Sequence, residues 1–440
     1  MKISELYKIF LKHPVITTDS RNVPDNSIFW ALKGENFNGN NYIPDALNSG
    51  ASYAITDDKA SFIPGKTILF NDTLKTLQLL ANYHRKQLNL PIFALTGTNG
   101  KTTTKELIFK ILSTQYNAVA TKGNLNNHIG VPLTILTFNK STEIGIVEMG
   151  ANHPGEIQQL CDIAEPNFGL ITNIGKAHLE GFGSFEKIIK TKSELYQSII
   201  KNKGTIFFNS DNPILNSLEK GHKTLTYGTN SDNYFKAQLL SVNPFVNLEI
   251  ETFEGLKTEI NSQLIGAYNF ENITTAACVG DFFKISIQNI KKAIENYTPD
   301  NNRSQFIKKD KNEIISDAYN ANPTSMKASL NNFLTLKKRN KIIILGDMYE
   351  LGKYSKEEHT EILELLKVAI QKNDSVKEII VTGKYFNEAF SNDFQDSGII
   401  HFITTIELET FLKNKTYYNC TFLIKGSRAM KLENLINYIS

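Results

Sequence analysis

A short glycine-framed loop between two apolar segments constrains the fold of this chain more than any other feature. Residues 91–95 form an apolar run typical of a buried strand, and residues 107–112 carry apolar side chains at helical spacing. The loop between them, at 97–102, reads Gly-Thr-Asn-Gly-Lys-Thr. In a strand–loop–helix unit the backbone N–H groups and the positive end of the helix dipole point to one place, which suits a phosphate. The sequence therefore predicts an α/β sheet with a phosphate site at this loop.

Each residue type in the loop suits a nucleotide phosphate. Gly97 and Gly100 let the backbone close around the anion, Lys101 can reach the β- and γ-phosphates, and the Thr102 hydroxyl can ligate Mg²⁺. The longer pattern G-x-x-x-x-G-K-[ST] would need a glycine where this chain has Leu95. The alternative is a chance Gly-Lys-Thr in a turn, but the flanking strand and helix favour nucleotide binding.

Composition limits the class of protein. The chain has 440 residues, 41% hydrophobic and 21% charged, which predicts a globular protein of two or three domains. A net charge of only +3 argues against nucleic-acid binding. Three distant cysteines fit a reducing compartment, and neither C-x-x-C nor H-E-x-x-H occurs, so we expect no disulfide framework and no zinc site of those kinds. Without a signal peptide or a membrane-length apolar run, we expect a cytoplasmic protein that does not insert into membranes.

Three domains are predicted along the chain. Residues 1–86 form a small α/β module, residues 87–298 form the nucleotide-binding unit, and residues 299–440 alternate strand and helix as in a doubly wound parallel sheet. Within the second unit, short alternating segments over residues 204–265 suggest antiparallel strands. Asn269 suits the N-cap of the helix that follows.

Polar side chains follow the predicted strands of the nucleotide-binding unit. Glu148 ends the strand at 144–148, where it could hold Mg²⁺ directly or through water, or could instead cap the next helix. His178 follows the strand at 170–174, although a lone histidine is more often a surface or packing residue. The Asn-rich loop at 121–128 either lines a substrate cleft or forms a solvated turn.

Lys192 lies in the middle of an apolar stripe. Residues 185–199 have helical periodicity, and the apolar side chains of this segment project to the same side as Lys192. A lysine there must extend its ammonium to water, find an anionic partner or lose its charge. A neutral lysine amine can add CO₂ and become a carbamate, which is an oxygen ligand for Mg²⁺.

Other polar segments are weaker indicators. Residues 18–21 precede the apolar run at 28–32 and are typical turn residues by themselves. Asn272, in the first turn of a predicted helix, could meet a base, and Arg303 could serve as a hinge or a phosphate contact. Polar motifs also follow the ends of predicted strands in the third domain, at 317–323, 346–352 and 425–428.

With these motifs in order, the chain resembles the Mur ligase family from Thr18 to about Met430. The match is best to the family member that joins D-alanyl-D-alanine to a UDP-N-acetylmuramoyl-tripeptide. The shared motifs are the loop at 97–102, the asparagines at 124, 126 and 127, and the segments 148–153, 317–323, 346–352 and 425–428. Tyr268 stands where the family usually has His, Ala267 where it often has Arg, and Ser193 where it usually has Gly.

The resemblance implies an α/β fold of three domains. The N-terminal domain would hold a UDP-sugar, the central P-loop domain, with its parallel sheet, would bind ATP and Mg²⁺, and the C-terminal Rossmann-like domain would close over the cleft. The implied activity is ATP-dependent amide formation in peptidoglycan precursor synthesis, with UDP-N-acetylmuramoyl-tripeptide and D-alanyl-D-alanine as substrates. We expect a monomer.

The resemblance also assigns residues. Catalytic roles fall on Lys101, Glu148, His178 and Lys192. ATP binding falls on Gly97, Thr98, Asn99, Gly100, Lys101, Thr102 and Thr103, with Asn272 at adenine, Asp317 at ribose and Arg303 at the phosphates. Thr102 and Glu148 would hold one Mg²⁺, and His178 and carbamylated Lys192 a second. Substrate binding falls on Thr18, Asp19, Ser20, Arg21, Asn124, Asn126, Asn127, Asn320, Asn322, Lys425 and Ser427.

Two alternatives remain open. One is another ligase of the same fold, such as a folylpolyglutamate synthase or a Mur ligase that adds a different amino acid. The other is a P-loop binding switch such as a GTPase. That class reads guanine with Asn-Lys-x-Asp, and the nearest segment here is Asn-Lys-Ser-Thr at 139–142, with no D-x-x-G segment elsewhere.

Overall fold

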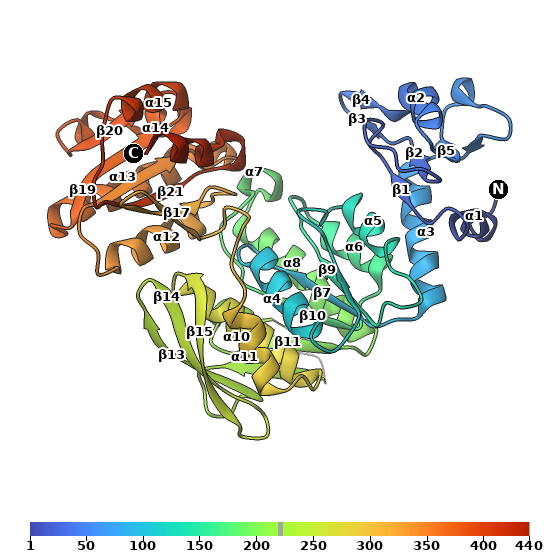
Figure 1. The fold of residues 1–440 in the computed structure, drawn as a ribbon, viewed down its shortest axis with the longest axis horizontal. Helices are drawn as coiled ribbons and strands as arrows, with labels where there is room; N and C mark the ends of the chain where they lie inside the picture. Colours follow the sequence, from blue (N-terminus) through green and yellow to red (C-terminus); the bar gives the residue numbers. More distant parts are fainter. Residues whose placement is uncertain (219–222, 440) are drawn as a thin grey trace.

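The computed structural model describes residues 1–218 and 223–439 and has three α/β domains in chain order (Figure 1). Each domain is built on its own sheet. The strand orders are β1-β2-β5-β6, then β15-β14-β13-β12-β11-β10-β7-β9-β8, then β16-β17-β21-β18-β19-β20. The predicted three-domain α/β architecture is therefore confirmed.

The N-terminal domain packs helices on both faces of a small parallel sheet. Its elements are α1 (Ile3–Phe10), β1 (Ile16–Thr17), β2 (Ile28–Trp30), β3 (Lys33–Gly34), β4 (Phe37–Asn38), η1 (Gly39–Tyr42), α2 (Ile43–Asn48), β5 (Tyr53–Thr56), η2 (Lys59–Ser61), β6 (Thr67–Leu69) and α3 (Thr73–Leu88). Alternate residues of β2 point to opposite faces. Trp30 packs toward α1 and α3, whereas Phe29 packs toward α2.

Helix α3 joins the first two domains. It begins at an N-cap aspartate, Asp72, whose carboxylate accepts from the Lys75 N–H at 2.8 Å. Its N-terminal part packs on the first sheet, and the Trp30 indole donates to the Thr73 carbonyl at 2.8 Å. Its C-terminal part packs on the central domain, where Arg85 Nε donates to the Ala164 carbonyl at 2.9 Å. Residue 86, the predicted domain boundary, lies inside this helix, near its C-terminal end.

The central domain contains the nine-stranded sheet. Its elements are β7 (Ile92–Thr96), α4 (Lys101–Leu112), β8 (Ala118–Ala120), α5 (Gly130–Ile135), β9 (Ile144–Glu148), α6 (Glu156–Ala164), β10 (Phe168–Ile171), α7 (Leu179–Phe182), α8 (Phe185–Lys201), β11 (Thr205–Asn209), α9 (Pro213–Asn216), β12 (Thr224–Gly228), β13 (Phe235–Val242), β14 (Phe245–Glu251), β15 (Lys257–Ile265), α10 (Tyr268–Phe282) and α11 (Ile287–Glu295). Phe93 and Leu95 of β7 face α4, α10 and α11, whereas Ile92 and Ala94 face α5, α6 and α8.

The prediction of antiparallel strands over 204–265 is wrong in its first half. Strands β11 and β12 pair in parallel with their neighbours, and antiparallel pairing begins only between β13 and β14. Strand β11 is an apolar run buried on both faces, as in a parallel sheet covered by helices. Strand β14 alternates buried and half-buried residues, which is typical of an antiparallel strand with one solvated face.

The C-terminal domain is a doubly wound sheet, as predicted. Its elements are β16 (Gln305–Lys309), β17 (Asn312–Asp317), α12 (Pro323–Thr335), β18 (Lys341–Gly346), η3 (Gly352–Tyr354), α13 (Ser355–Lys372), β19 (Val376–Thr382), α14 (Lys384–Ala389), η4 (Asn392–Phe394), β20 (Ile399–Phe402), α15 (Thr405–Lys413), β21 (Thr421–Lys425), η5 (Arg428–Met430) and η6 (Leu432–Tyr438). Among the described strands of this domain, only the edge strand β16 pairs antiparallel. Ile343 and Leu345 of β18 pack toward α12 and α13, and Ile342 and Ile344 toward α15 and η6.

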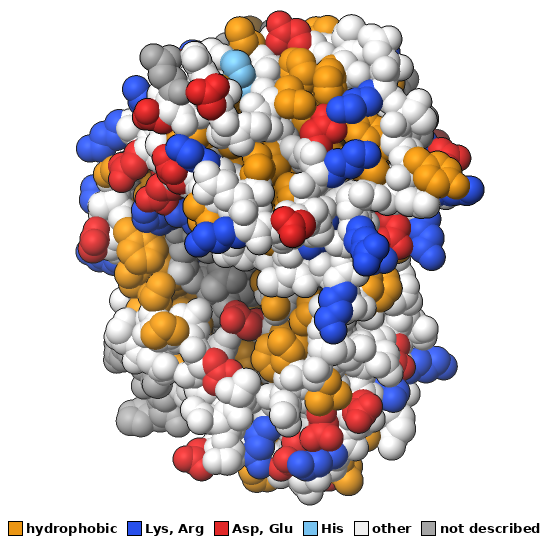
Figure 2. All heavy atoms as spheres, turned by 90° about the vertical axis from the view of Figure 1, so that its left-hand side faces the viewer, with side chains coloured by type: hydrophobic (Ala, Val, Ile, Leu, Met, Phe, Trp, Pro, Cys, Tyr) orange, Lys and Arg blue, Asp and Glu red, His pale blue; other side chains and the backbone are white. Residues whose placement is uncertain are grey.

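The surface carries charges of both signs. Acidic and basic side chains are interspersed over the side of the molecule that Figure 2 shows. In the described part of the chain, no helix is both long enough and apolar enough to cross a membrane.

Candidate functional site

A cavity of about 660 Å³ lies between the central and C-terminal domains. Its walls come from the ends of β7, β9 and β10 on one side and of β17 and β21 on the other, where polar residues follow the carboxyl ends of parallel strands. Most of the predicted site residues line it: Gly97, Thr98, Asn99, Gly100, Lys101, Thr102, Thr103, Asn124, Asn126, Asn127, Glu148, His178, Lys192, Asn272, Arg303, Asp317, Asn320, Asn322 and Lys425.

The glycine loop joins β7 directly to α4, whose first residue is Lys101. Gly100 has a φ of +80°, and a Cβ there would lie 2.3 Å from Asn272 Oδ1. Only glycine fits both the left-handed conformation and this close approach. Gly100 and the first turn of α4 line the cavity, and the N-terminus of a helix is a site where an anion can bind.

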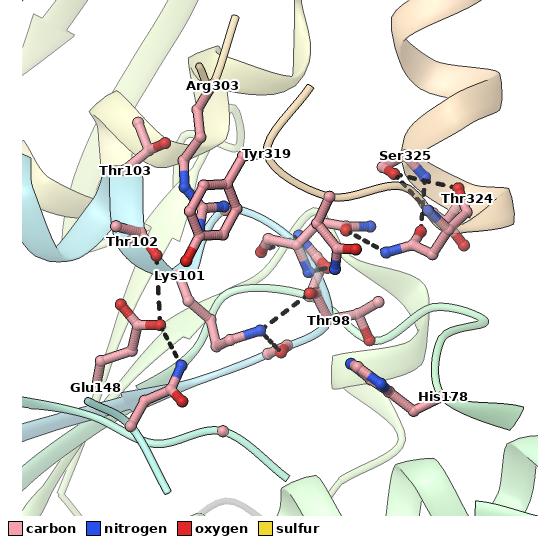
Figure 3. A pocket seen from close by; sticks show the side chains of 18 of the residues that line it. Thr98, Lys101, Thr102, Thr103, Glu148, His178, Arg303, Tyr319, Thr324 and Ser325 are labelled. Carbon is pink, nitrogen blue, oxygen red and sulfur yellow. Dashed lines mark hydrogen bonds between the residues drawn. The ribbon is translucent and has the colours of Figure 1, made fainter. Parts of the chain in front are cut away.

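Lys101 folds back over the loop. Its Nζ donates to the carbonyl oxygens of Gly97 at 2.7 Å and Thr98 at 3.0 Å (Figure 3). Burial lowers the pKa of Lys101 to about 8, the nearby Glu148 carboxylate opposes that shift, and the Arg303 guanidinium adds to it. The ammonium thus lies where the loop would hold an anion, and a phosphate would stabilise its charged form.

Glu148 has a carboxylate oxygen free for a ligand. Its Oε1 accepts from Asn126 Nδ2 at 2.8 Å and from Thr102 Oγ1 at 3.3 Å (Figure 3). Its Oε2 is buried and has no hydrogen-bond partner among the described residues; Lys105 Nζ lies 3.9 Å away. Glu148 does not cap the next helix, α6: the N–H groups at its start, those of Gly155 and Gln158, donate to the Glu194 carboxylate, and Glu156 accepts the N–H groups of the turn before it. That alternative is excluded.

These groups fit a hard divalent cation. A buried carboxylate oxygen without a hydrogen bond, beside a threonine hydroxyl, offers the oxygen ligands that Mg²⁺ prefers. Within residues 1–218 and 223–439, no group of three or more His, Cys, Asp or Glu side chains could hold a metal by itself. A metal in this cavity would therefore need other ligands, such as Thr102, Lys192 or a nucleotide.

Lys192 is buried in α8. Its exposed fraction is 3%, so the ammonium does not reach bulk water and the alternative that it extends to solvent is excluded. Burial, together with the charge of Lys101, lowers the pKa of Lys192 well below its ordinary value. Among the described residues its Nζ has no carboxylate ion-pair partner. A neutral amine at the edge of the cavity is the state that can react with CO₂.

His178 lies at the start of α7 and lines the same cavity. Its Nδ1 contacts the carboxylate of Glu350, which belongs to the C-terminal domain. The pKa of Glu350 is lowered chiefly by the hydrogen bond with this histidine. One ring nitrogen of His178 is therefore engaged across the domain boundary.

An ion pair and a cation–π contact stabilise the wall of the cavity that the C-terminal domain forms. Lys425 Nζ donates to Asp317 Oδ2 at 2.6 Å, and the Arg303 guanidinium lies over the Tyr319 ring, 3.6 Å from its centroid. Asn322 Nδ2 donates to Asn99 Oδ1 of the glycine loop at 2.8 Å. The two domains thus share one polar site.

Five predicted site residues lie elsewhere. Thr18, Asp19, Ser20 and Arg21 belong to the N-terminal domain, where an exposed ion pair with Arg21 lowers the pKa of Asp19 to about 2, chiefly through the side-chain hydrogen bond. Ser427 is buried inside the C-terminal domain, and its hydroxyl accepts from the Tyr349 N–H at 2.9 Å. Their substrate roles stay predictions.

Asn269 does not cap its helix, so that prediction is wrong. Helix α10 begins two residues earlier than a cap at Asn269 would require, at Tyr268, and Ala267 occupies the N-cap position. Asn269 is buried, and its Nδ2 donates to the Ile265 carbonyl at 2.7 Å. Its Oδ1 accepts from Asn272 Nδ2 at 2.8 Å, and Asn272 Oδ1 accepts from Thr104 Oγ1 at 3.1 Å. The pair is buried behind the glycine loop.

Sequence reasoning missed several residues around the cavity. Tyr319 and Glu350 lie inside motifs that were recognised, but neither was given a role. Lys105 lies four residues after Lys101 on α4, and this spacing, which puts both lysines on one face of the helix, is the signal that could have pointed to it. Its 3.9 Å distance to Glu148 is visible only in the structure. Tyr268, a departure from the family pattern, also lines the cavity, and its hydroxyl contacts Ser304 Oγ at 2.6 Å.

A phosphate-binding loop at the strand ends of one α/β domain, closed over by a second, defines a multidomain P-loop nucleotide-binding protein. Comparison with known sequences agrees domain by domain: residues 14–82 match the Mur ligase family, catalytic domain, residues 95–280 the Mur ligase middle domain, and residues 302–428 the Mur ligase, glutamate ligase domain. The chain belongs to the Mur ligase family.

Relatives in this family match over nearly the full length. The chain is 33% identical to the UDP-N-acetylmuramoyl-tripeptide–D-alanyl-D-alanine ligase of Bacillus subtilis, over 96% of this chain and 92% of that protein. A crystal structure of MurF from Acinetobacter baumannii superposes with a TM-score of 0.84 at 29% identity, covering 99% and 98% of the two chains. MurF ligase from Thermotoga maritima, in complex with ADP, gives a TM-score of 0.83 at 27% identity, covering 98% and 97%.

Proposed function

We propose that this protein is an ATP-dependent ligase that joins D-alanyl-D-alanine to UDP-N-acetylmuramoyl-tripeptide through an acyl phosphate, in peptidoglycan precursor synthesis. The name of the Bacillus subtilis relative states this reaction, and the Thermotoga maritima relative was solved with ADP. The observation that carries the proposal is that Lys101, Glu148, His178 and Lys192 line one cavity together with residues of the C-terminal motifs at 317–323 and 425–428. We also propose that the enzyme acts as a monomer in the cytoplasm.

ATP would bind with its phosphates on the glycine loop. The residues assigned to this are Gly97, Thr98, Asn99, Gly100, Lys101, Thr102 and Thr103. Lys101 contacts carbonyls of the loop, and its ammonium would transfer to the phosphates. We assign Arg303 to the phosphates, Asp317 to the ribose and Asn272 to the adenine. All three line the cavity beside the loop, which supports these assignments.

Two Mg²⁺ ions would be held at this site. Thr102 and Glu148 would hold the first, and His178 and carbamylated Lys192 the second. The ions would offset the negative charge that gathers when a carboxylate approaches a triphosphate. The unpartnered Oε2 of Glu148 and the buried amine of Lys192 support this assignment.

The reaction would proceed in two steps. The terminal carboxylate of the tripeptide attacks the γ-phosphorus of ATP, ADP leaves, and an acyl phosphate forms. The amine of D-alanyl-D-alanine then attacks the acyl carbon, and the tetrahedral intermediate expels phosphate and leaves an amide. Lys101 and the N–H groups of the loop stabilise the charge of the transferred phosphoryl group. Contact between the domains, such as Asn99 with Asn322, keeps water from the acyl phosphate.

Substrate contacts are assigned by domain. Residues Thr18, Asp19, Ser20 and Arg21 of the N-terminal domain would hold the UDP-sugar. The cavity residues Asn124, Asn126, Asn127, Asn320, Asn322 and Lys425, together with Ser427, would contact the tripeptide or the dipeptide. Exposure of Asp19 and Arg21 supports a surface site on the first domain.

The test is a phosphate-release assay with purified protein, ATP and Mg²⁺. We expect phosphate only when UDP-N-acetylmuramoyl-tripeptide and D-alanyl-D-alanine are both present, and a product whose mass equals their sum less one water. Parallel reactions contain other UDP-muramoyl-peptides, single amino acids, or a folate with glutamate. Turnover with one of those, and none with the dipeptide, would reject the proposed substrates but not the ligase chemistry.

A further inference from the structure

Glu350 reaches from the C-terminal domain to the central domain by two contacts. Its carboxylate meets Nδ1 of His178, and its backbone carbonyl accepts the Glu180 N–H at 3.2 Å. Both contacts fall on the segment that begins α7, beside the cavity. Close packing continues at Gly352, where a Cβ would lie 3.2 Å from the side chain of Glu180.

The backbone of Glu350 is held in an unusual conformation. Its φ is +63°, in the left-handed region that residues with a Cβ seldom adopt, and His178 opposite it has a φ of +50°. The neighbours of Glu350 fix it: Met348 and Leu351 are buried, and the Met348 N–H donates to His359 Nε2 at 3.0 Å. Such conformations persist where the surroundings over-determine them, often at functional sites.

A carboxylate that contacts one ring nitrogen of a histidine determines whether the other nitrogen is protonated, and so whether it can accept a hydrogen bond or bind a metal. When Nδ1 donates its proton to a carboxylate, a neutral imidazole presents Nε2 as an acceptor or ligand. Metal-binding histidines are commonly oriented in this way by a carboxylate that does not itself touch the metal. His178 lines the cavity, so its orientation controls what its ring offers there.

We propose that Glu350 is a positioning residue that fixes the orientation of His178, so that the cavity is completed only when the C-terminal domain is docked. A second contact beside it, between Lys176 Nζ and the buried carboxylate of Glu358 at 2.7 Å, holds the same loop against the same domain. The consequence for catalysis rests on the proposed function, whereas the orientation of His178 does not.

The orientation is tested by NMR of the ¹⁵N-histidine-labelled full chain without ligands. The His178 ring signals are assigned by their loss in His178→Ala. We expect Glu350→Ala to shift these signals and Glu350→Gln, which keeps an acceptor oxygen, to shift them less. The control Glu357→Ala removes an exposed carboxylate of α13 in the same domain and should leave them unchanged. Unchanged His178 signals in Glu350→Ala would overturn the proposal.

The catalytic consequence is tested by kinetics at saturating ATP. We expect Glu350→Ala to lower kcat or to raise the Mg²⁺ concentration for half-maximal rate by about tenfold to a hundredfold, with Glu350→Gln in between. In a His178→Ala background, Glu350→Ala should cause little further change in kcat or in the Mg²⁺ requirement. If Glu350 only held the domains together, Glu350→Ala would lower the rate by the same factor in the His178→Ala background as in the wild type. That result would overturn the proposal. Absence of any ligase turnover in the wild-type protein would instead reject the proposed function, and the NMR result would still decide the role of Glu350.

Discussion

Lys425 Nζ donates a hydrogen bond to Asp317 Oδ2 at 2.6 Å, joining the carboxyl ends of the adjacent strands β21 and β17. The lysine side chain is only 2% exposed and the aspartate side chain 15%. Removal of one partner from a buried ion pair leaves the other charge without compensation, and this costs more than the pair itself contributes. The wall of the cavity therefore depends on both residues.

We predict that Asp317→Asn destabilises the protein by about 3 kcal/mol, because it leaves the buried Lys425 ammonium without a counter-charge. Lys425→Met should destabilise the protein less. The remaining Asp317 carboxylate is more exposed than Lys425, and it still accepts a hydrogen bond from the Ser304 N–H at 3.3 Å. Urea unfolding measures both. Lys236→Met, which breaks a more exposed pair with Glu251, serves as the control and should cost about 1 kcal/mol or less. Equal losses in all three variants would contradict the prediction.

The affinity for ATP should depend on the protonation of Lys101. Burial lowers the pKa of this lysine to about 8, so in the free protein the ammonium is lost as the pH rises through that value. We predict that calorimetry finds weaker ATP binding at pH 9 than at pH 7. In Lys101→Arg the guanidinium stays charged over this range, and the affinity should change little with pH. A wild-type affinity independent of pH would contradict this.

Lys101→Ala removes the ammonium altogether. We expect no ATP-dependent product, since the charge of the transferred phosphoryl group would lose its side-chain cation. The assay is product mass after incubation with both substrates. Near-normal turnover would reject the role of Lys101.

Gly100→Ala should lower the free energy of unfolding by more than the left-handed backbone conformation at this position explains. Gly100 and Gly255 have φ values of +80° and +81°, but only at Gly100 would a Cβ meet another atom, Asn272 Oδ1 at 2.3 Å. We predict a loss of about 1–2 kcal/mol for Gly255→Ala, from the left-handed backbone. Gly100→Ala should lose more in urea unfolding and should also bind ATP more weakly. Equal losses in the two variants would show that Asn272 moves aside freely.

Lys192→Ala should lose most activity and regain part of it with a small carboxylic acid. The buried amine has a pKa well below its ordinary value, and in the neutral form it can add CO₂ to give the carboxylate that the added acid would replace. Ligase rates with and without added acetate measure the rescue. Lys190→Ala, on the solvent side of α8, is the control and should need no rescue. Full activity of Lys192→Ala without acid would remove the carbamate from the mechanism.

Local patterns in the sequence predicted the features that depend on near neighbours. The strand, loop and helix around Lys101 were found because apolar periodicity and glycine placement act within a few residues. The place of Lys192 on the apolar stripe of a single helix was predicted in the same way, whereas only the structure decided that its side chain is buried and does not extend to water. The same reasoning failed at Asn269, because the helix starts two residues earlier than predicted and the side chain donates a hydrogen bond to the end of strand β15 instead.

The sequence by itself determined three α/β units, a phosphate loop and the residue types at the ends of their strands, since each depends on local periodicity and backbone sterics. Only the tertiary structure decided which of these ends meet. Asn99 and Asn322 bond across 223 residues of chain, and Glu350 meets His178 from another domain. No periodicity records such pairs, because they depend on how whole sheets pack against each other.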